Sequence, residues 1–233
     1  MKNLYTLGII AGMLAMGSMA MAYPTLNGET GIVALPNALT AGNGSFVGAA
    51  DLLFTNDNSL KVRALYGLSS QAEIGASLSS GDDNGISISA KYRFTSGPSR
   101  FNLAAGGALT AANHQDTAID LYLVGTEAFP LGGQSSRPLL GTFGVHFVNI
   151  GSDNTLRPFI GAQYPIGPRS ELGAEFQLRD GNFFHSPLTS VVLRHKFTSA
   201  WAGQVGVTNA TGYGTTSGYH PFLGAQFTFT QKH

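Results

Sequence analysis

Acidic and basic residues recur at matching places in two parts of this 233-residue chain. Glu73 begins the sequence Glu-Ile-Gly-Ala, and Glu171 begins the closely similar Glu-Leu-Gly-Ala. Each acid is followed later in the chain by two basic residues separated by one position: Lys91, Arg93, Arg194 and Lys196. If these residues face one narrow passage through the protein, their charges of both signs create a field across it. Such a field favours the passage of zwitterionic or neutral polar solutes. The same residues could instead pair as salt bridges and close the space between them.

Residues for covalent or metal-dependent catalysis are sparse. No Gly-x-Ser-x-Gly sequence occurs, the six histidines show no His-x-x-x-His spacing, and the chain has no cysteine. His195 takes the place of Tyr92 in the repeat and lies near Ser199. It is expected on the lipid-facing side of the protein, at the interface between membrane and water. We therefore expect no enzyme, no cofactor and no bound metal. An enzyme that acts on lipid acyl chains is a third alternative, but no catalytic triad can be placed for it.

The segments that must position these residues alternate between apolar and polar side chains. In residues 86–94, Ile, Ala and aromatic residues alternate with Ser, Lys and Arg, which predicts a strand with two unlike faces. Candidate strands cover 45–54, 60–68, 72–80, 86–94, 101–110, 118–129, 139–150, 157–165, 171–179, 188–197, 201–208 and 221–229. Sequences also recur, since 91–96 is similar to 194–199 and 157–164 to 220–227. This pattern predicts an all-β, antiparallel transmembrane β-barrel of about 12 strands, within a range of about 10–14.

Strand parity predicts which side chains point into the barrel. The expected lumen-lining residues are Lys61, Arg63, Glu73, Lys91, Arg93, Glu171, Glu175, Arg179, Arg194 and Lys196, and Asp51 shares their parity. Several inward positions are glycine, including Gly67, Gly75, Gly161, Gly173, Gly206 and Gly224. Small residues leave space and favour a cavity, whereas a narrow barrel is filled by its own side chains. A polar pore and a filled, salt-bridged interior both stay open on these observations.

Aromatic residues gather at one end of the predicted strands, next to short connections. They are Tyr66, Tyr92, Phe94, Phe101, Phe129, Tyr164, Phe197, Trp201, Phe227 and Phe229. Such clustering is typical of the aromatic girdle at a membrane interface. In a β-sandwich, the alternative fold, core rings would be spread along the strands. Connections at the other end, over 180–187 and 209–220, are long and favour external loops.

The N-terminal residues have the features of a secretory leader. Lys2 supplies a positive charge, residues 4–17 are mostly apolar, and Ala20-Met21-Ala22 matches a cleavage site. We therefore assign 1–22 to a signal peptide, 23–44 to an N-terminal segment and 45–230 to the barrel. The N-terminal segment is broken by proline and glycine, and it fits a plug, a short strand or part of the wall.

The composition suits a membrane barrel better than a soluble domain. Charged residues make up 11% of the chain, against about 25% in ordinary soluble domains. The 13 basic and 13 acidic residues balance, which argues against nucleic acid as a partner. Because an exported chain without cysteine has no disulfides, its stability must come from the hydrogen-bonded sheet.

A resemblance to a known family rests on the first third of the chain. Thr30-Gly-Ile-Val-Ala-Leu-Pro-Asn-Ala is followed by Gly44, then by Tyr66-Gly-Leu and Glu73-Ile-Gly-Ala. This order resembles the start of the YjbH-type outer-membrane barrels over residues 26–94, and again more weakly over 157–198. The resemblance implies an outer-membrane barrel associated with exopolysaccharide production and export. Its motifs are structural and carry over no catalytic residue.

The expected location is the outer membrane of a Gram-negative-type cell, with both termini in the periplasm and lipid as the surroundings. The favoured function is a small porin-like channel or an export-associated component, with a polysaccharide or a small polar solute as its partner. A structural or interaction barrel with a plugged lumen is the alternative.

The leader and the strand pattern predict how the protein fractionates. Cleavage after Ala22 should leave a mature chain in the outer-membrane fraction. A closed barrel resists detergent until it is boiled, so the mature protein should migrate differently on an SDS gel before and after boiling. N-terminal sequencing and this gel check the prediction, and recovery as a soluble periplasmic protein would contradict it.

Overall fold

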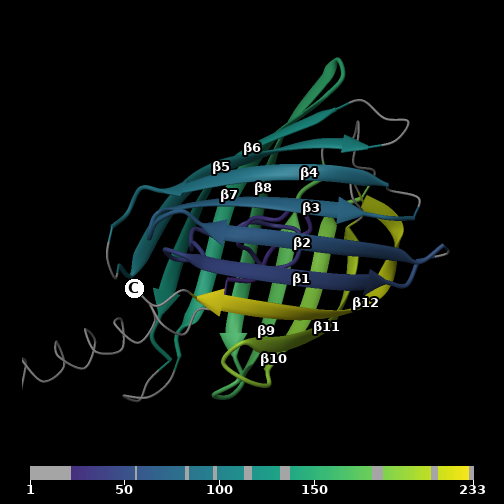
Figure 1. Ribbon diagram of the computed structural model, residues 1–233. Helices are drawn as coiled ribbons and strands as arrows, with labels where there is room; N and C mark the ends of the chain where they lie inside the picture. Colours follow the sequence, from purple (N-terminus) through teal and green to yellow (C-terminus); the bar gives the residue numbers. More distant parts are fainter. Residues whose placement is uncertain are drawn as a thin grey trace, which may run out of the picture.

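A computed structural model of the protein describes residues 22–55, 57–81, 84–96, 99–112, 117–131, 137–179, 186–210 and 215–230. These residues form twelve strands in one sheet that closes on itself (Figure 1). The strands are β1 (Ser45–Leu53), β2 (Ser59–Gly67), β3 (Ala72–Ser79), β4 (Gly85–Arg93), β5 (Phe101–Ala112), β6 (Ala118–Phe129), β7 (Leu139–Ile150), β8 (Asp153–Pro165), β9 (Ser170–Gln177), β10 (Leu188–Lys196), β11 (Trp201–Ala210) and β12 (Thr215–Thr230). No helix among the described residues is long and apolar enough to cross a membrane.

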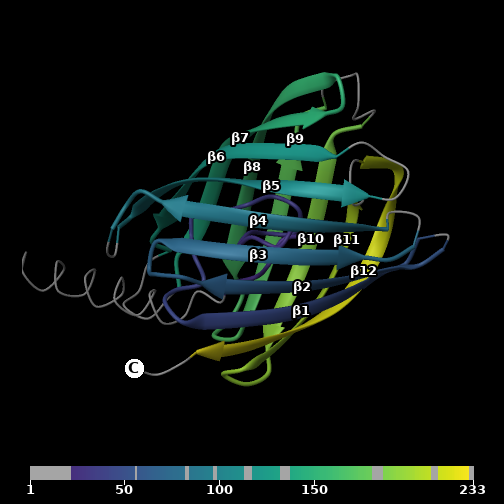
Figure 2. The same ribbon diagram turned by 45° about the horizontal axis from the view of Figure 1, so that its top comes forward.

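Closure of the sheet satisfies the backbone of every strand. Each strand pairs antiparallel with its neighbours in the sequence, and β1 pairs with β12 to complete the ring. Figure 2 shows the strands running obliquely around the ring, as closure of a sheet requires. The prediction of an antiparallel barrel of about 12 strands is confirmed, and the sandwich alternative is wrong because a single closed sheet forms the wall.

The two faces of the wall differ in the way that the alternation predicts. In β4, Ile86 and Ile88 are exposed on the outside, while Ser87 and Lys91 are buried. Exposed apolar side chains continue around the outer face, among them Leu52, Ile74, Leu109, Leu121, Phe143, Ile160, Leu193, Val205 and Leu223. An apolar outer face of this kind suits lipid hydrocarbon, because it exposes few polar side chains to the lipid.

Several strand boundaries differ from the prediction. β9 ends at Gln177, before the predicted end of the strand. β8 begins at Asp153 and β12 at Thr215, both within polar sequence that was predicted as connection. Gly151, with a φ of 60°, allows the tight turn between β7 and β8, because this left-handed conformation favours glycine. The predicted long loop over 209–220 is therefore mostly strand, since sheet pairing continues where the apolar alternation has ended.

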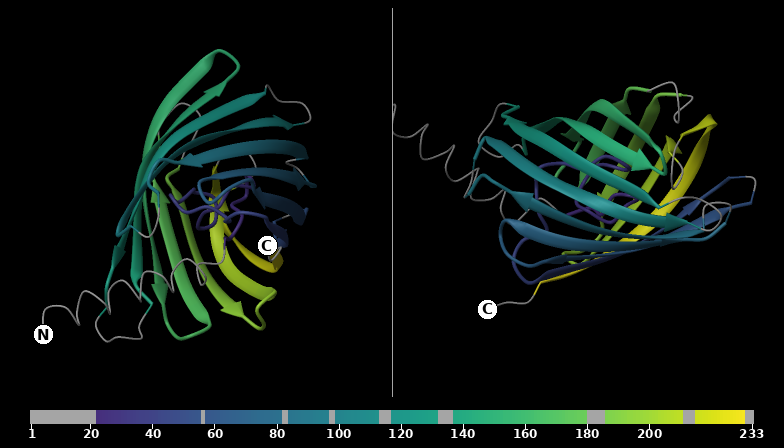
Figure 3. Two further views of the ribbon diagram at one scale, coloured as in Figure 1. Left: turned by 60° about the vertical axis from the view of Figure 1, so that its left-hand side comes forward. Right: turned by 90° about the horizontal axis from the view of Figure 1, so that it is seen from above.

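Residues 22–44, which we call the lumenal segment, lie inside the barrel and do not join its wall. Both views of Figure 3 show this purple segment within the ring of strands. It has no regular strand, but it folds back on itself through two isolated bridges, Pro24 with Thr30 and Gly31 with Pro36. The predicted leader falls on residues that lie outside the described ones, except for Ala22.

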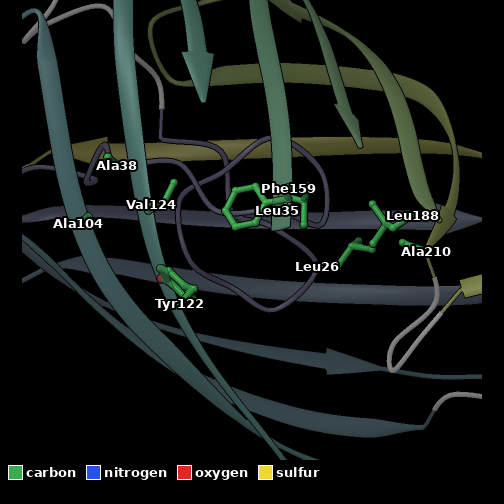
Figure 4. Packing of buried hydrophobic residues seen from close by; sticks show 9 residues of the cluster. All are labelled: Leu26, Leu35, Ala38, Ala104, Tyr122, Val124, Phe159, Leu188 and Ala210. Carbon is green, nitrogen blue, oxygen red and sulfur yellow. The ribbon is translucent and has the colours of Figure 1, made fainter. Parts of the chain in front are cut away.

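Apolar side chains of the lumenal segment pack against the inner wall. Figure 4 shows Leu35 beside Phe159 of β8, within a buried apolar cluster. Ile32 belongs to a second cluster with Val192 of β10 and Phe222 of β12. Each fully buried side chain of this size contributes about 1.5–3 kcal/mol relative to exposure. The core of the molecule therefore lies between the wall and the segment that it surrounds.

The facing of the wall makes a prediction for arginine substitutions. Ala174 lies in the middle of β9 and faces outward, whereas Ala200 lies in the turn between β10 and β11. Ala174→Arg should lower the free energy of unfolding by about 2–4 kcal/mol, because it places a charge in the hydrocarbon. Ala200→Arg should cost less than about 1 kcal/mol near the interface. Urea unfolding in lipid vesicles measures both changes in the free energy of unfolding. Equal changes would contradict the assignment of Ala174 to the lipid-facing side of the wall.

Candidate functional site

Glu175 on β9 binds the lumenal segment through its backbone. The Glu175 Oε2 atom accepts hydrogen bonds from Val33 N at 3.0 Å and from Leu35 N at 3.1 Å. Its Oε1 atom accepts one from Ala34 N at 2.8 Å. Consecutive backbone amides that converge on one anion form a concave anion site. The buried charge of Glu175 and the buried amides of the segment therefore satisfy each other.

Glu73 and Lys91 form a second contact with the segment. The two residues are cross-strand partners on β3 and β4, with 2.8 Å between Lys91 Nζ and Glu73 Oε1. The Glu73 carboxylate also accepts hydrogen bonds from Thr30 N at 2.8 Å, from Thr30 Oγ1 at 2.7 Å and from Ala41 N at 2.7 Å. Lys91 Nζ donates to the carbonyl oxygens of Thr30 at 2.9 Å and Asn37 at 3.1 Å. The pair thus engages both the donors and the acceptors of the segment.

Glu171 and Arg194 repeat this arrangement on β9 and β10. They are also cross-strand partners, with 3.2 Å between Arg194 Nη1 and Glu171 Oε1. Arg137 Nη2 donates to Glu171 Oε2 at 3.0 Å. The guanidinium carbon of Arg194 lies 4.0 Å from the centre of the Tyr23 ring, in cation–π geometry. The second acid–base pair therefore contacts the beginning of the lumenal segment.

Strands on the closing side of the barrel bind the same end of the segment. Arg63 forms an ion pair with Asp51 and donates a hydrogen bond to the carbonyl oxygen of Pro24. Gln204 Nε2 donates to the second Asp51 oxygen at 2.6 Å. Gln226 Nε2 donates to the carbonyl oxygen of Ala22 at 3.0 Å. A buried pair such as Asp51 and Arg63 is costly unless its other polar atoms find partners. Pro24 and Gln204 supply two of these partners, while Arg63 Nε has none among the described residues.

The repeated Phe-(Ile/Leu)-Gly-Ala-Gln sequence places equivalent side chains on β8 and β12. Phe159 and Phe222 are both buried against apolar residues of the lumenal segment. Gln163 Oε1 accepts a hydrogen bond from Asn37 Nδ2 at 3.1 Å, and Gln226 binds Ala22 as described above. The sequence repeat is therefore a repeat of contacts to the segment as well as of strands.

The inward glycines make room for the segment. A Cβ atom on Gly75 would collide with the carbonyl oxygen of Gly28, and one on Gly67 would collide with that of Gly42. A Cβ atom on Gly161 would collide with the side chain of Ile32. The interpretation that these small residues leave an open cavity is therefore corrected, because residues 22–44 occupy the space.

The structure buries most of the charged residues predicted to line the lumen. Buried are Lys61, Arg63, Glu73, Lys91, Glu171, Glu175 and Arg194, and Asp51 is buried with them. Arg93 and Lys196 are half-buried at the ends of their strands, where Arg93 Nη2 donates to the carbonyl oxygen of Ser70 at 2.7 Å. Arg179 is exposed and lies beyond the end of β9, because the strand stops at Gln177.

Sequence reasoning missed several polar residues that meet in the lumen. They are Glu29, Asn37, Asp120, Thr126, Gln163, Gln204 and Gln226. Gln163 and Gln226 could have been found, because they hold the same place in the repeated sequence. Asp120 could have been found from the parity of β6, where it lies between outward-facing Ile119 and Leu121. Glu29 and Asn37 lie outside any strand, and no periodicity predicts where they point.

The predicted girdle residues lie on the outer face at one end of the barrel. Those exposed are Tyr66, Tyr92, Phe94, Phe101, Phe129, Tyr164, Phe197, Trp201 and Phe229. Phe227 is half-buried, with its ring centre 5.0 Å from that of Trp201. All of them adjoin the connections that follow the even-numbered strands, and successive antiparallel strands bring these connections to the same end.

Groups for catalysis are not brought together in the described residues. His195 Nδ1 lies 2.9 Å from Ser170 Oγ on the outer face, and Ser199 is not its partner. No carboxylate forms a hydrogen bond with His195 in the described part of the chain, so a triad lacks its orienting group. Over the same ranges, no cluster of His, Asp and Glu side chains is suited to a metal ion. His114, His185 and His233 lie outside the described residues.

A closed antiparallel wall with an apolar outer face and charged inner face is the architecture of outer-membrane porin-like barrels. The KdgM porin has this fold, with a TM-score of 0.62 over 79% of this chain and 99% of the porin, at 14% identity. The NanC porin gives 0.57 over 78% and 98%, at 11% identity. The outer membrane channel of Pseudomonas putida F1 gives 0.52 over 82% and 98%, at 16% identity. No family model and no curated protein matches the sequence.

The contacts of Glu175 predict the effect of its amide variant. Glu175→Gln keeps the shape but turns a donor toward amides that need an acceptor, so the segment should lose about 1–3 kcal/mol of attachment. A cysteine in place of Ala34 reports this, because the natural chain has no other thiol. Glu175→Gln should raise the rate at which a water-soluble maleimide labels that cysteine.

Glu127→Gln is the matched control, since the Glu127 ion pair with Arg100 lies at the partly exposed end of β6. It should leave the labelling rate unchanged. Equal rates in the Glu175→Gln and Glu127→Gln variants would contradict a role for Glu175 in holding the segment.

Proposed function

We propose that the protein is a small porin-like channel of the outer membrane whose lumen is occluded at rest by residues 22–44. The lumenal segment carries this proposal, because it lies across the interior of a barrel that has the fold of solved porins. Among the described residues the wall strands pair with one another all the way around the ring, so the wall does not depend on the segment for its own ladder of hydrogen bonds. The segment can therefore leave the lumen while the barrel stays closed.

The proposed location is the outer membrane, with both termini in the periplasm. The apolar outer face supports contact with lipid, and the aromatic residues at one end support an interfacial girdle. The end with those aromatics carries the start of β1 and the end of β12, and its connections include several tight turns. Bacterial barrels place short turns in the periplasm, which supports this orientation, although the turn between β7 and β8, at the opposite end, is shorter still. Residues 1–22 would act as the leader that directs export. Cleavage after Ala22 would remove the contact between Gln226 and Ala22 and leave residues 23–44 in the lumen.

The proposed solutes are small, polar and either neutral or zwitterionic. Once the segment has left, the wall presents Glu73, Glu171 and Glu175 together with Lys91 and Arg194. Charges of both signs facing one lumen favour neither cations nor anions, and they attract molecules with a dipole. The KdgM porin has been solved in complex with disordered oligogalacturonate. A polysaccharide cargo, with a part in exopolysaccharide export, is the wider proposal for this chain.

A structural or interaction barrel with a permanently filled lumen is the second candidate. The specific observation in its favour is that wall carboxylates on β3 and β9 bind the segment through several backbone amides each. We do not propose an acyl-modifying enzyme, because the pair of Ser170 and His195 has no orienting carboxylate among the described residues.

Deletion of residues 25–40 tests the channel. The shortened chain keeps every residue of the wall, so it should still form a barrel, and its open lumen should conduct ions. We expect wild-type protein in planar lipid bilayers to show little conductance and the deletion variant to show steady conductance. Glu127→Gln should behave as the wild type, because its change lies outside the lumen.

The migration shift on boiling shows whether the deletion variant has folded. A folded deletion variant that does not conduct would contradict the channel and support the structural barrel. Wild-type protein that conducts as freely as the deletion variant would contradict occlusion by the segment.

A further inference from the structure

Glu29 differs from the carboxylates of the wall. It belongs to the lumenal segment and is only 1% exposed, yet neither carboxylate oxygen has a hydrogen-bond partner among the described residues. Glu73 and Glu175 are buried to a similar degree, but each accepts three hydrogen bonds from the segment. A buried carboxylate without such partners is very costly when it is ionised. Glu29 is therefore best accommodated as a neutral carboxyl group.

The charged groups that face Glu29 do not offer it a free counter-charge. Lys91 on β4 is engaged by Glu73 at 2.8 Å. His146 on β7 is engaged by Asp120 on β6, with 2.8 Å between Nδ1 and Oδ1. Asp120 itself carries the same sign as an ionised Glu29 and opposes its ionisation. Loss of the Glu29 proton would thus add a net negative charge to a closed part of the lumen.

Uncharged polar atoms on the same side of the lumen also lack partners. The hydroxyls of Tyr122 and Ser89 and the Nε2 atom of His146 are buried without a hydrogen bond among the described residues. The Ser89 hydroxyl and the carbonyl group of Gly28, the neighbour of Glu29, both lie close to the position that a Cβ atom on Gly75 would take. A hydroxyl group both donates and accepts, as a protonated carboxyl group does. These surroundings suit the neutral form of Glu29 better than the charged form.

The titration of Glu29 agrees with this geometry. Burial raises the pKa of Glu29 from 4.5 to about 7, and the charge of Asp120 acts in the same direction, against the amide of Glu29, Lys91 and His146. In an open, hydrated lumen the carboxyl group would return toward its ordinary pKa. Protonation therefore stabilises the occluded arrangement. That stabilisation is complete below about pH 4.5 and is lost as the pH rises through about 7.

We propose that Glu29 is a proton-binding site that sets whether residues 22–44 stay in the lumen. The protonated carboxyl group keeps the segment in place, and transfer of its proton to water leaves a charge that is satisfied only when the segment becomes hydrated. This inference rests on the proposed occlusion of the lumen and adds the signal that relieves it. The effector is the proton, and a less acidic medium favours the open barrel.

Thiol labelling tests the site without relying on conduction. Ala34→Cys reports access to the segment, and Ser152→Cys in the exposed turn between β7 and β8 corrects for the pH dependence of the thiol itself. The ratio of the two labelling rates should rise roughly tenfold to a hundredfold between about pH 5 and about pH 8.5. Glu29→Gln, which stays neutral, should hold the ratio low throughout. Glu127→Gln, the matched control, should keep the wild-type rise.

Asp120→Asn provides a second variant should Glu29→Gln fail to fold, which the boiling shift reveals. It removes the like charge beside Glu29, so the rise should move to lower pH. A ratio that is flat with pH in the wild-type background would overturn the proton site. So would an equal rise with Glu29→Gln, or an unmoved midpoint with Asp120→Asn.

Bilayer conductance of the same preparations separates this inference from the channel. If the ratio follows the prediction and no variant conducts at any pH, the proton site stands and the proposed channel fails. If conductance rises together with the ratio, both stand.

Discussion

Mutual satisfaction of buried polar groups is the constraint on which the whole interior depends. The lumenal segment has almost no regular secondary structure, so the amides that its internal turns leave unpaired must find acceptors elsewhere. The wall carries buried carboxylates, which need donors in the same measure. Glu175 meets both needs at once, because three consecutive amides of the segment converge on its two oxygens. Either partner alone would leave costly unpaired groups inside the barrel.

Duplication in the wall explains how a segment without periodicity is held at several points. One hairpin provides Glu73 with Lys91, and its repeat provides Glu171 with Arg194 as the same cross-strand pair. The first pair contacts the middle of the segment at Thr30, and the second contacts its start at Tyr23. The wall is therefore approximately repetitive, whereas the lumenal segment is not. Each copy of the hairpin binds a different part of that segment.

Properties that repeat every second residue could be predicted, and properties that depend on a distant partner could not. Alternation is local, so the barrel, the strands and the inward parity of Glu73, Lys91 and Arg194 follow from the sequence. The same parity could not reveal that Glu175 meets amides more than a hundred residues away. Gly75 shows the difference most clearly, because a missing side chain has the same sequence signature beside an empty channel and beside a packed backbone.

The magnitudes indicate why such a segment could be both firmly placed and removable. Its buried apolar side chains, such as Ile32 and Leu35, each contribute about 1.5–3 kcal/mol. Each hydrogen bond to the wall contributes only about 0.5–1.5 kcal/mol net, because water can replace it when the segment leaves.

Ordering the backbone of the segment opposes these gains by about 1–2 kcal/mol per residue. The balance is therefore a small difference between large terms. A change of one pKa unit between the two arrangements amounts to about 1.4 kcal/mol, which is comparable to that difference. A single buried carboxyl group on the segment, Glu29, is thus sufficient to tip the balance, whereas the closed wall, with a hydrogen-bonded neighbour on both sides of every strand, is not affected.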